Sequence, residues 1–447
     1  MTGQRRSPLW LLATGLAAAS PPLPLAAQQV PAAQQAMTLN EAVRRALAVQ
    51  PSLIQAEGDQ RNASAGQRSA AGAFLPSITL GGGSNKTGAN RYNSQTGQFV
   101  TEPPSTSYSG SVGVSLDLFT GFRRLANKSA AAATADAADA GVTNQRYQVT
   151  AATAQLFFTA LADEDLVRVA QAQVNRAKEE RQISVNKFQA GAATRSDTLT
   201  STVDLGNAQL ALLQAQANLA TAQANLGRQV GSDQPIRAVA DSALPPVPDT
   251  TALRSAVLDS APQLRQAQAQ ARAARAQVTA ARAQYWPTIS ASYSNGYSGP
   301  DSLAGFPLAP WSTTKPYGNN WGLRFSVSWT LFNGFTREAE QVSAAVLRDV
   351  AEAHAADLRR QLNAQFTQQV AATFTAYAQI AITGANVAAA AEALRVQQER
   401  YRLGAATLLD LLTAEANLTQ AAVNQVQARY NYLIARAQVE ALVGRTL

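Results

Sequence analysis

The sequence contains no cysteine, a single histidine (His354) and only two methionines, Met1 and Met37. Without cysteine there is no disulfide, no zinc–thiolate site and no lipid anchor on an N-terminal cysteine. Beyond Met37 the chain also offers no sulfur ligand to a soft metal such as copper or silver. One histidine among alanines supports neither a metal centre nor a Ser/His/Asp triad. We therefore expect no cofactor, no metal and no enzymatic activity.

Aromatic and charged residues are also scarce, at 6% and 15% of the chain. The sequence is rich in Ala and Gln, which suits long helices with thin cores better than a wide globular interior. The formal net charge is +8. The Lys and Arg residues are nevertheless dispersed, with no basic run, so we expect no nucleic-acid partner.

Long apolar runs are missing as well. Residues 9–19 are apolar, but this segment is too short to cross a bilayer. Arg5 and Arg6 precede it and small residues follow, which is typical of a secretory signal peptide, placed here at residues 1–27. If the mature protein enters a membrane, it must do so with strands.

The chain is duplicated. Residues 114–122 return as 327–335, and residues 188–194 return as 401–407, both 213 positions later. This period is far longer than a solenoid unit. It predicts two equivalent repeats, 28–231 and 253–447, joined by a Pro-rich segment at 232–252.

Two segments of each repeat alternate between apolar and small polar residues, which is typical of strands with one apolar face. We expect strands at about 75–86, 108–119, 286–297 and 321–332, with polar loops at 87–107 and 298–319. The apolar faces are predicted to contact lipid through Val112, Val114, Leu116 and Leu118 in one repeat and Leu323, Phe325, Val327, Trp329 and Leu331 in the other.

A half-buried soluble sheet would show the same alternation. The hydroxyl-rich polar faces and the aromatic residues at the strand ends, such as Trp321 and Phe332, favour a transmembrane barrel. Four strands cannot close a barrel, so the barrel would be shared between chains.

Two very long helices follow the strands. Residues 122–189 and 335–403 contain no proline, and at 1.5 Å per residue each would reach about 100 Å. Each ends at a glycine, Gly191 or Gly404, which predicts helical hairpins with tips at 188–197 and 401–410. A soluble or fibrous coiled-coil scaffold would explain the helices but not the strands or the signal peptide.

These features together resemble the TolC family of outer membrane efflux channels. The motifs that carry the resemblance are the doubled strand ends at 118–122 and 331–335, the segment Tyr401-x-x-Gly404-x-x-Thr407-x-x-Asp410, and residues 428–433. The resemblance implies a homotrimer with a 12-stranded barrel in the outer membrane, continued by a helical barrel in the periplasm. It also implies a periplasmic adaptor protein and an inner-membrane pump as partners. A channel for type I protein secretion is the alternative within the family. Longer relatives have a C-terminal equatorial element that we do not expect after Gly444.

The resemblance also assigns residues at the two tips. Asp410, its counterpart Asp197 and the neighbouring Tyr401 are expected to form the periplasmic entrance. Thr413 stands where the best-known member has a second Asp, and Ala406 where it has an Arg, so we expect a weaker closure. Asp410 could instead stabilise only the hairpin. The small residues of the tips are expected to dock the adaptor: Gly191, Ala192, Ala193 and Thr194 in one repeat, Gly404, Ala405, Ala406 and Thr407 in the other.

Overall fold

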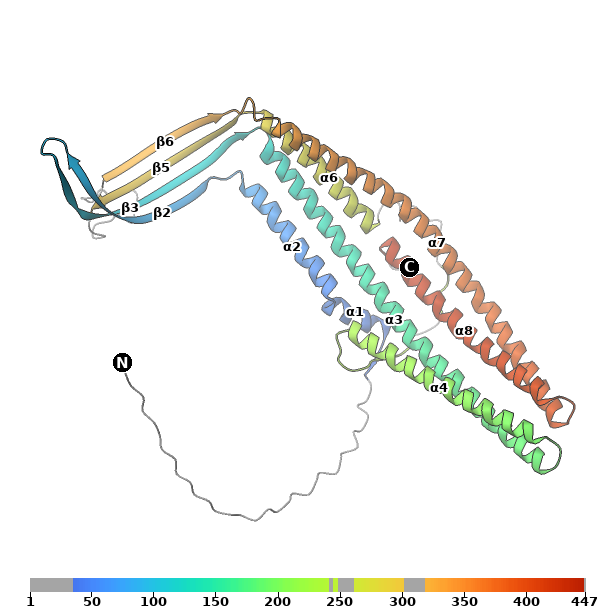
Figure 1. Ribbon diagram of the computed structural model, residues 1–447. Coiled ribbons are helices and arrows are strands. Elements are labelled where there is room, and N and C mark those ends of the chain that lie inside the picture. Colours follow the sequence, from blue (N-terminus) through green and yellow to red (C-terminus); the bar gives the residue numbers. More distant parts are fainter. Residues whose placement is uncertain (1–34, 241–243, 248–260, 301–317, 446–447) are drawn as a thin grey trace, which may run out of the picture.

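The computed structural model describes residues 35–240, 244–247, 261–300 and 318–445. The expected signal peptide, most of the expected loop 298–319 and part of the Pro-rich segment 232–252 lie outside these ranges. The described residues form an elongated molecule with a sheet at one end and a layer of long helices leading away from it (Figure 1).

Helices dominate the structure. They are α1 (Leu39–Val49), α2 (Pro51–Gly72), α3 (Arg123–Gln189), α4 (Arg195–Gln229), α6 (Pro262–Arg282), α7 (Thr336–Arg402) and α8 (Leu408–Val443), and a short 3₁₀ turn, η1 (Ala283–Tyr285), follows α6. The helices α3 and α7 have 67 residues each, or about 100 Å, because no proline interrupts them. Proline does occur at the start of α2 and α6, where its missing N–H costs nothing.

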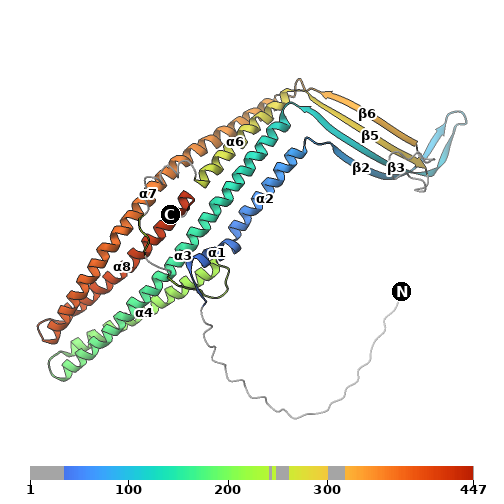
Figure 2. The same ribbon diagram turned by 180° about the vertical axis from the view of Figure 1, so that it is seen from behind.

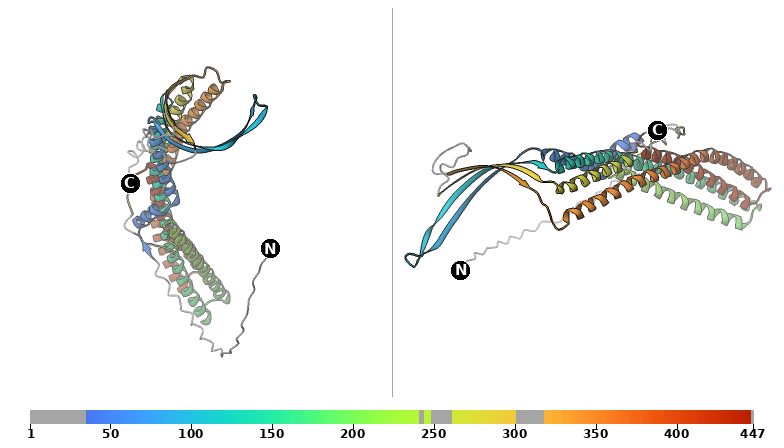
Figure 3. Two further views of the ribbon diagram at one scale, coloured as in Figure 1. Left: turned by 90° about the vertical axis from the view of Figure 1, so that its left-hand side faces the viewer. Right: turned by 90° about the horizontal axis from the view of Figure 1, so that it is seen from above.

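The helices form a wall one helix thick. Near the sheet the order across the wall is α2, α3, α6, α7, and farther away it is α4, α3, α8, α7. Shorter helices lie end to end within the wall: Gly444 at the end of α8 abuts Pro262 at the start of α6. Buried alanines on α6, such as Ala267, Ala271 and Ala274, let neighbouring helices approach closely. Figure 3 shows the wall edge-on, with the sheet curling away from it as an open arc.

The sheet has the order β2 (Ser77–Asn93), β3 (Gln98–Thr120), β5 (Thr288–Pro300), β6 (Gly318–Ser328), and all of its pairs are antiparallel. Directly paired residues share a face. One face carries rows such as Ile78, Val114, Tyr293 and Leu323; the other carries rows such as Ser77, Ser115, Ser292 and Arg324. Within the described residues β2 and β6 do not pair with each other, so the sheet of one chain stays open.

The prediction of a loop at 87–107 is wrong. The strands β2 and β3 continue through it as a paired hairpin, with Arg91 opposite Val100 and Tyr92 opposite Phe99. The rings of Tyr92 and Phe99 meet edge to face at 5.2 Å. The turn needs only residues 94–97, where Gly97 has a φ of +63°. Both faces of this hairpin carry polar side chains, so the sequence lacks the apolar–polar alternation by which strands are predicted.

Three of the predicted lipid-facing residues also need correction. Asp117 pairs with Ser290, but the next pair is Phe119 with Ile289, so Leu118 is an extra residue in a β-bulge. Phe119 therefore occupies the apolar row that Leu118 was expected to occupy. The strand β6 ends at Ser328, so Trp329, Leu331 and the expected end aromatic Phe332 lie in the connection to α7. Trp329 is held there because its Nε1 donates to the Tyr285 carbonyl, at 3.2 Å.

The strand-to-helix junction is built twice with the same contacts. The Arg124 guanidinium lies over the Phe74 ring at 4.9 Å and donates to the Leu118 carbonyl, and the Arg337 guanidinium lies over Tyr285 at 4.5 Å and donates to the Leu331 carbonyl. Each junction also holds a phenylalanine at positive φ, Phe122 at +70° and Phe335 at +64°. The αL region is uncommon for such a bulky residue. The structural duplication therefore extends to individual side chains.

The described parts of the connection between the repeats, residues 232–240 and 244–247, contact the first strand and the last helix. A two-residue parallel pairing joins β1 (Ala36–Met37) to β4 (Arg237–Ala238). The Tyr432 hydroxyl donates to the Pro245 carbonyl at 2.8 Å, and Arg436 donates to the Pro246 carbonyl at 3.1 Å. No helix in the described part of the chain is both long enough and apolar enough to cross a membrane.

Candidate functional site

The two hairpin tips lie side by side at the end of the wall farthest from the sheet (Figure 2). Each long helix ends in a Schellman turn. The Ala192 amide donates to the Lys187 carbonyl at 2.8 Å, and the Ala405 amide donates to the Arg400 carbonyl at 2.7 Å. Gly191 and Gly404 occupy the positive-φ position, at +74° and +77°. Glycine is needed at both positions for its backbone conformation, since a Cβ there would meet no atom within 4 Å.

Each return helix then begins with a capping box. In α4 the Asp197 amide donates to the Thr194 hydroxyl oxygen at 3.2 Å, and the Thr194 amide donates to the Asp197 carboxylate at 2.9 Å. In α8 the Asp410 amide donates to the Thr407 hydroxyl oxygen at 3.2 Å, and the Thr407 amide donates to Asp410 at 2.9 Å. In each tip, the Thr that was expected to dock the adaptor and the Asp that was expected at the entrance are thus bonded to each other.

The Asp410 carboxylate is exposed yet strongly engaged. Its Oδ2 also accepts from the Thr407 hydroxyl at 2.7 Å. The hydroxyl first, and then the backbone amide, lower the pKa of Asp410 below its usual value. The carboxylate is therefore charged at neutral pH, and it stabilises the start of α8. This capping role is compatible with a further role of its charge at the entrance.

Tyr401 links the two hairpins. It is buried at the end of α7, and its hydroxyl lies 3.3 Å from Ser184 Oγ on α3. The Lys187 ammonium lies 3.8 Å from the centre of the Tyr401 ring and donates to the Tyr401 carbonyl. Thr413 turns back onto its own helix, because its hydroxyl donates to the Leu409 carbonyl at 2.8 Å. Tyr401 is therefore joined to α3 of its own chain, whereas Thr413 makes no hydroxyl bond to a neighbouring helix in the described residues.

A cluster of three carboxylates lies between the hairpins, and the sequence did not reveal it. Glu180 of α3, Asp204 of α4 and Glu415 of α8 have carboxylate oxygens within 4.8 Å of one another. The counterparts of Glu180 and Glu415 in the other repeat are Ala393 and Thr202. The cluster is therefore not repeated, and comparing the two repeats could not predict it.

The environment of this acid cluster disfavours negative charge. Burial, followed by the proximity of Glu415, raises the pKa of Glu180 to about 9. Burial also raises the pKa of Glu415 and of Asp204. Three ionised carboxylates at this distance would repel one another strongly, so the cluster needs a proton or a cation to neutralise it.

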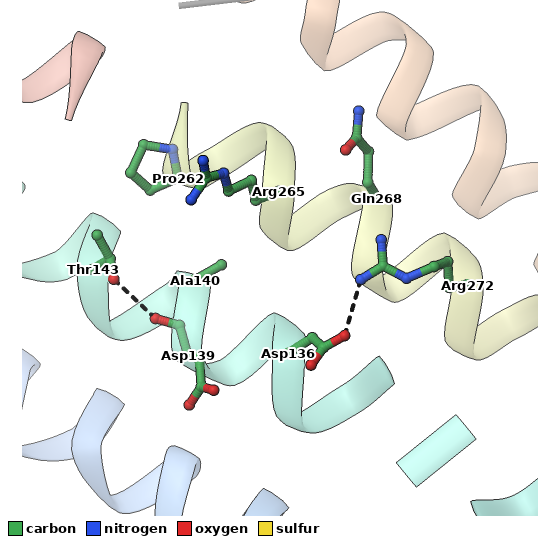
Figure 4. A pocket seen from close by; sticks show the side chains of 8 residues that line it. All are labelled: Asp136, Asp139, Ala140, Thr143, Pro262, Arg265, Gln268 and Arg272. Carbon is green, nitrogen blue, oxygen red and sulfur yellow. Dashed lines mark hydrogen bonds and ion pairs between the residues drawn. The ribbon is translucent and has the colours of Figure 1, made fainter. Parts of the chain in front are cut away.

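A separate groove of ≈ 320 Å³ lies between α3 and α6 (Figure 4). Its charged side chains come from both helices, and Arg272 of α6 bridges to Asp136 of α3 at 3.1 Å. Thr143 donates to the backbone carbonyl of Asp139 within α3, at 3.1 Å. The groove is open and polar, and its one ion pair is exposed, so it marks the packing of two helices better than a ligand site.

Comparisons with known proteins agree with this architecture. The model of the family described as outer membrane efflux protein matches residues 42–232 and 253–445, one stretch in each repeat. A sequence search among curated proteins finds no match.

Several solved structures share the fold, and each match covers 91% of this chain. They include the CmeC outer membrane channel of Campylobacter jejuni (18% identity, 85% of that chain, TM-score 0.79), the outer membrane protein VceC of Vibrio cholerae (19%, 96%, 0.76) and the MtrE outer membrane channel of Neisseria gonorrhoeae in its open state (20%, 89%, 0.75). At this identity the likeness shows the fold alone. The family model, which matches most of both repeats, decides membership: the chain belongs to the outer membrane efflux protein family.

Proposed function

We propose that this chain is a passive exit duct that carries small molecules from the periplasm across the outer membrane. Three copies would form a 12-stranded barrel continued by a periplasmic helical barrel. A periplasmic adaptor and an inner-membrane pump would complete the machine, and the pump would supply the energy. The family of the chain supports the efflux role; a channel for type I protein secretion is the alternative that shares this architecture.

The observation that carries the proposal is that the sheet and the helical wall of the single chain both have edges that a neighbouring copy could cover. Among the described residues the sheet has two free edges, β2 and β6, and a four-stranded sheet cannot close by itself. Pairing β6 of one copy with β2 of the next gives 12 strands after three copies, which is within the range of known barrels. Such head-to-tail contacts close into a ring.

The helical edges of the wall support the same assembly. On α4, which lies at one edge, Leu199, Val203 and Leu210 are exposed in the single chain. On α7, at the other edge, Val342, Val346 and Val350 form an exposed stripe at four-residue spacing. Such stripes are typical of helix–helix seams. A neighbouring protomer on each side would cover both.

The two sheet faces suit a barrel in lipid. Leu323, Phe325 and Val327 are 59–69% exposed on the apolar face of the free edge strand β6. The opposite face carries hydroxyls and Arg324, as expected for a water-filled lumen. We propose the apolar rows, from Val112, Val114, Leu116 and Phe119 across to β6, as the lipid-facing surface.

The tips are proposed as the periplasmic entrance and the adaptor-binding surface. Asp410, backed by Asp197, would form rings of three carboxylates at the periplasmic entrance, and the Tyr401 link would help hold it closed. The small residues of the two turns, Gly191 to Thr194 and Gly404 to Thr407, would dock the adaptor; all are exposed except Ala193 and Ala406, which are half-buried. Small side chains there allow close backbone approach.

Fractionation of cells that express the full chain tests the assembly. We expect the protein in the outer-membrane fraction, as a trimer that dissociates on heating before electrophoresis. A soluble protein, or a monomer under every condition, would exclude the proposal and favour a coiled-coil scaffold.

A further inference from the structure

The acid cluster Glu180, Asp204 and Glu415 joins three helices that are far apart in the sequence. The helices α3 and α4 form the first hairpin, and α8 belongs to the second. Each carboxylate contributes an oxygen to a group no more than 4.8 Å across. The cluster therefore lies where the two hairpins of one chain meet.

Glu180 is the distinctive member of the cluster. Its side chain is 3% exposed, and when the cluster is ionised no donor of the described residues reaches its carboxylate oxygens; only a carboxyl proton shared with Glu415 would bond them. Glu415 is nearly as deeply buried, at 6%. Leaving a buried carboxylate without a donor costs far more than leaving a neutral group unpaired. An ionised Glu180, buried beside two other acids and reached by no other donor of the described residues, indicates a missing positive ligand.

One cation among the described residues acts on the cluster but does not fill that position. Arg176, one turn before Glu180 on α3, directs its Nη2 at Thr419 Oγ1, at 3.0 Å, and its Nε is buried without an acceptor. Its positive charge still acts on Glu415 through space. Three carboxylates and one guanidinium leave a local charge of about −2 when all are ionised, which a single divalent cation would neutralise.

We propose that Glu180, Asp204 and Glu415 form a binding site for a hard divalent cation of the calcium type, which joins the two hairpins of each chain. The ligands are all oxygen, with no histidine or cysteine, and this set suits Ca²⁺ or Mg²⁺ better than a transition metal. Two oxygens bound to one Ca²⁺ at about 2.4 Å can lie up to about 4.8 Å apart, which matches the size of the cluster. Water would supply the remaining ligands.

The site would lock the relative position of the hairpins near the proposed entrance. Its location, a few turns above the tips, also separates it from the Asp410 ring. That ring would need three chains, whereas this site is complete within one. The effect on opening rests on the proposed duct function; the binding itself does not.

The test uses the full-length purified protein, stripped with a chelator and titrated with CaCl₂ in a calorimeter. We expect one saturable site per chain. Glu180→Gln and Asp204→Asn should each weaken binding by about 10-fold or more, because each removes one of three charged ligands. Glu179→Gln is the matched control, since it removes an exposed charge from the same helix without removing a ligand.

Thermal unfolding, followed with and without CaCl₂, gives the second measurement. We expect Ca²⁺ to raise the melting temperature of the unaltered protein and of Glu179→Gln, but not of Glu180→Gln. The rival explanation is a carboxylate group neutralised by a shared proton. In that case Glu180→Gln, which mimics the protonated acid, keeps full stability and Ca²⁺ has no saturable effect on any variant. Either absence of saturable binding or equal binding by Glu180→Gln and Glu179→Gln would overturn the proposal.

Discussion

The Asp410 carboxylate accepts hydrogen bonds from both the amide and the hydroxyl of Thr407, at 2.9 and 2.7 Å, and so closes the first turn of α8. In the first repeat the Asp197 carboxylate accepts from the Thr194 amide alone, and the Asp197 amide donates to the Thr194 hydroxyl oxygen. An acidic residue that the sequence resemblance assigns to the entrance therefore has a structural role in its own tip. The two roles call for variants that separate them.

The first prediction separates charge from capping at Asp410. Asp410→Ala removes both the carboxylate and its bonds to Thr407, whereas Thr407→Ala removes the two bonds of the hydroxyl and leaves the charge. If three copies of Asp410 line the entrance, Asp410→Ala should lower cation selectivity in planar bilayers and weaken block by a trivalent cation. Thr407→Ala should keep most of both. Equal effects of the two variants would reduce Asp410 to a cap.

The second prediction concerns acid. The pKa of the Asp410 carboxyl is lowered in the folded tip from its ordinary value of 3.8, so its capping contribution is fully present above 3.8 and disappears as pH falls through the folded value. The start of α8 should therefore stay equally protected between pH 7 and pH 5. Hydrogen exchange at residues 408–414, corrected for the intrinsic pH dependence, measures this. Loosening within that window in the parent protein but not in Asp410→Asn would contradict the capping account.

The third prediction concerns the sheet. Val327→Arg would place a charge on the proposed lipid face and should cost about 2–4 kcal/mol if the site lies near the membrane midplane. Ser326→Arg, one residue away on the polar face, should cost much less, because it would face water. The yield of heat-sensitive trimer in the outer membrane is the readout. If both variants assemble equally well, the faces are assigned wrongly.

The fourth prediction concerns docking. Gly404 has a φ of +77°, so any larger residue there strains the turn itself. Ala405 is exposed and free of that constraint, and Ala405→Trp should impair export and crosslinking to the adaptor while the trimer remains intact. Thr96→Trp, in the exposed turn between β2 and β3 at the other end of the molecule, is the control. Unchanged adaptor crosslinking in Ala405→Trp would place the contact elsewhere.

The resemblance to the outer membrane efflux family is confirmed, and particular residues show why. The strand-end motif occurs twice in the sequence, at 118–122 and 331–335. In each copy the phenylalanine that ends the motif has a positive φ, and a nearby arginine donates to a carbonyl of the motif. Such local constraints leave a sequence pattern. The Pro-free stretches likewise predicted two long helices, and α3 and α7 occupy them.

What could not be predicted depends on contacts between distant segments. The bulge at Leu118 appears only in the register between β3 and β5. The hairpin of β2 and β3 continues through a polar segment because its strands pair with each other, not because one of its faces is apolar. The acid cluster joins Glu180 and Glu415, which are separated by more than half of the chain and have no acidic counterparts in the other repeat.

The most direct test of the central claim is the structure of the purified protein in a lipid nanodisc by electron cryomicroscopy. The account predicts a three-fold ring in which β6 of one chain pairs with β2 of the next, with Phe325 and Val327 facing lipid and one continuous lumen from sheet to tips. A monomer, a filament or a closed ring of another strand number would contradict it.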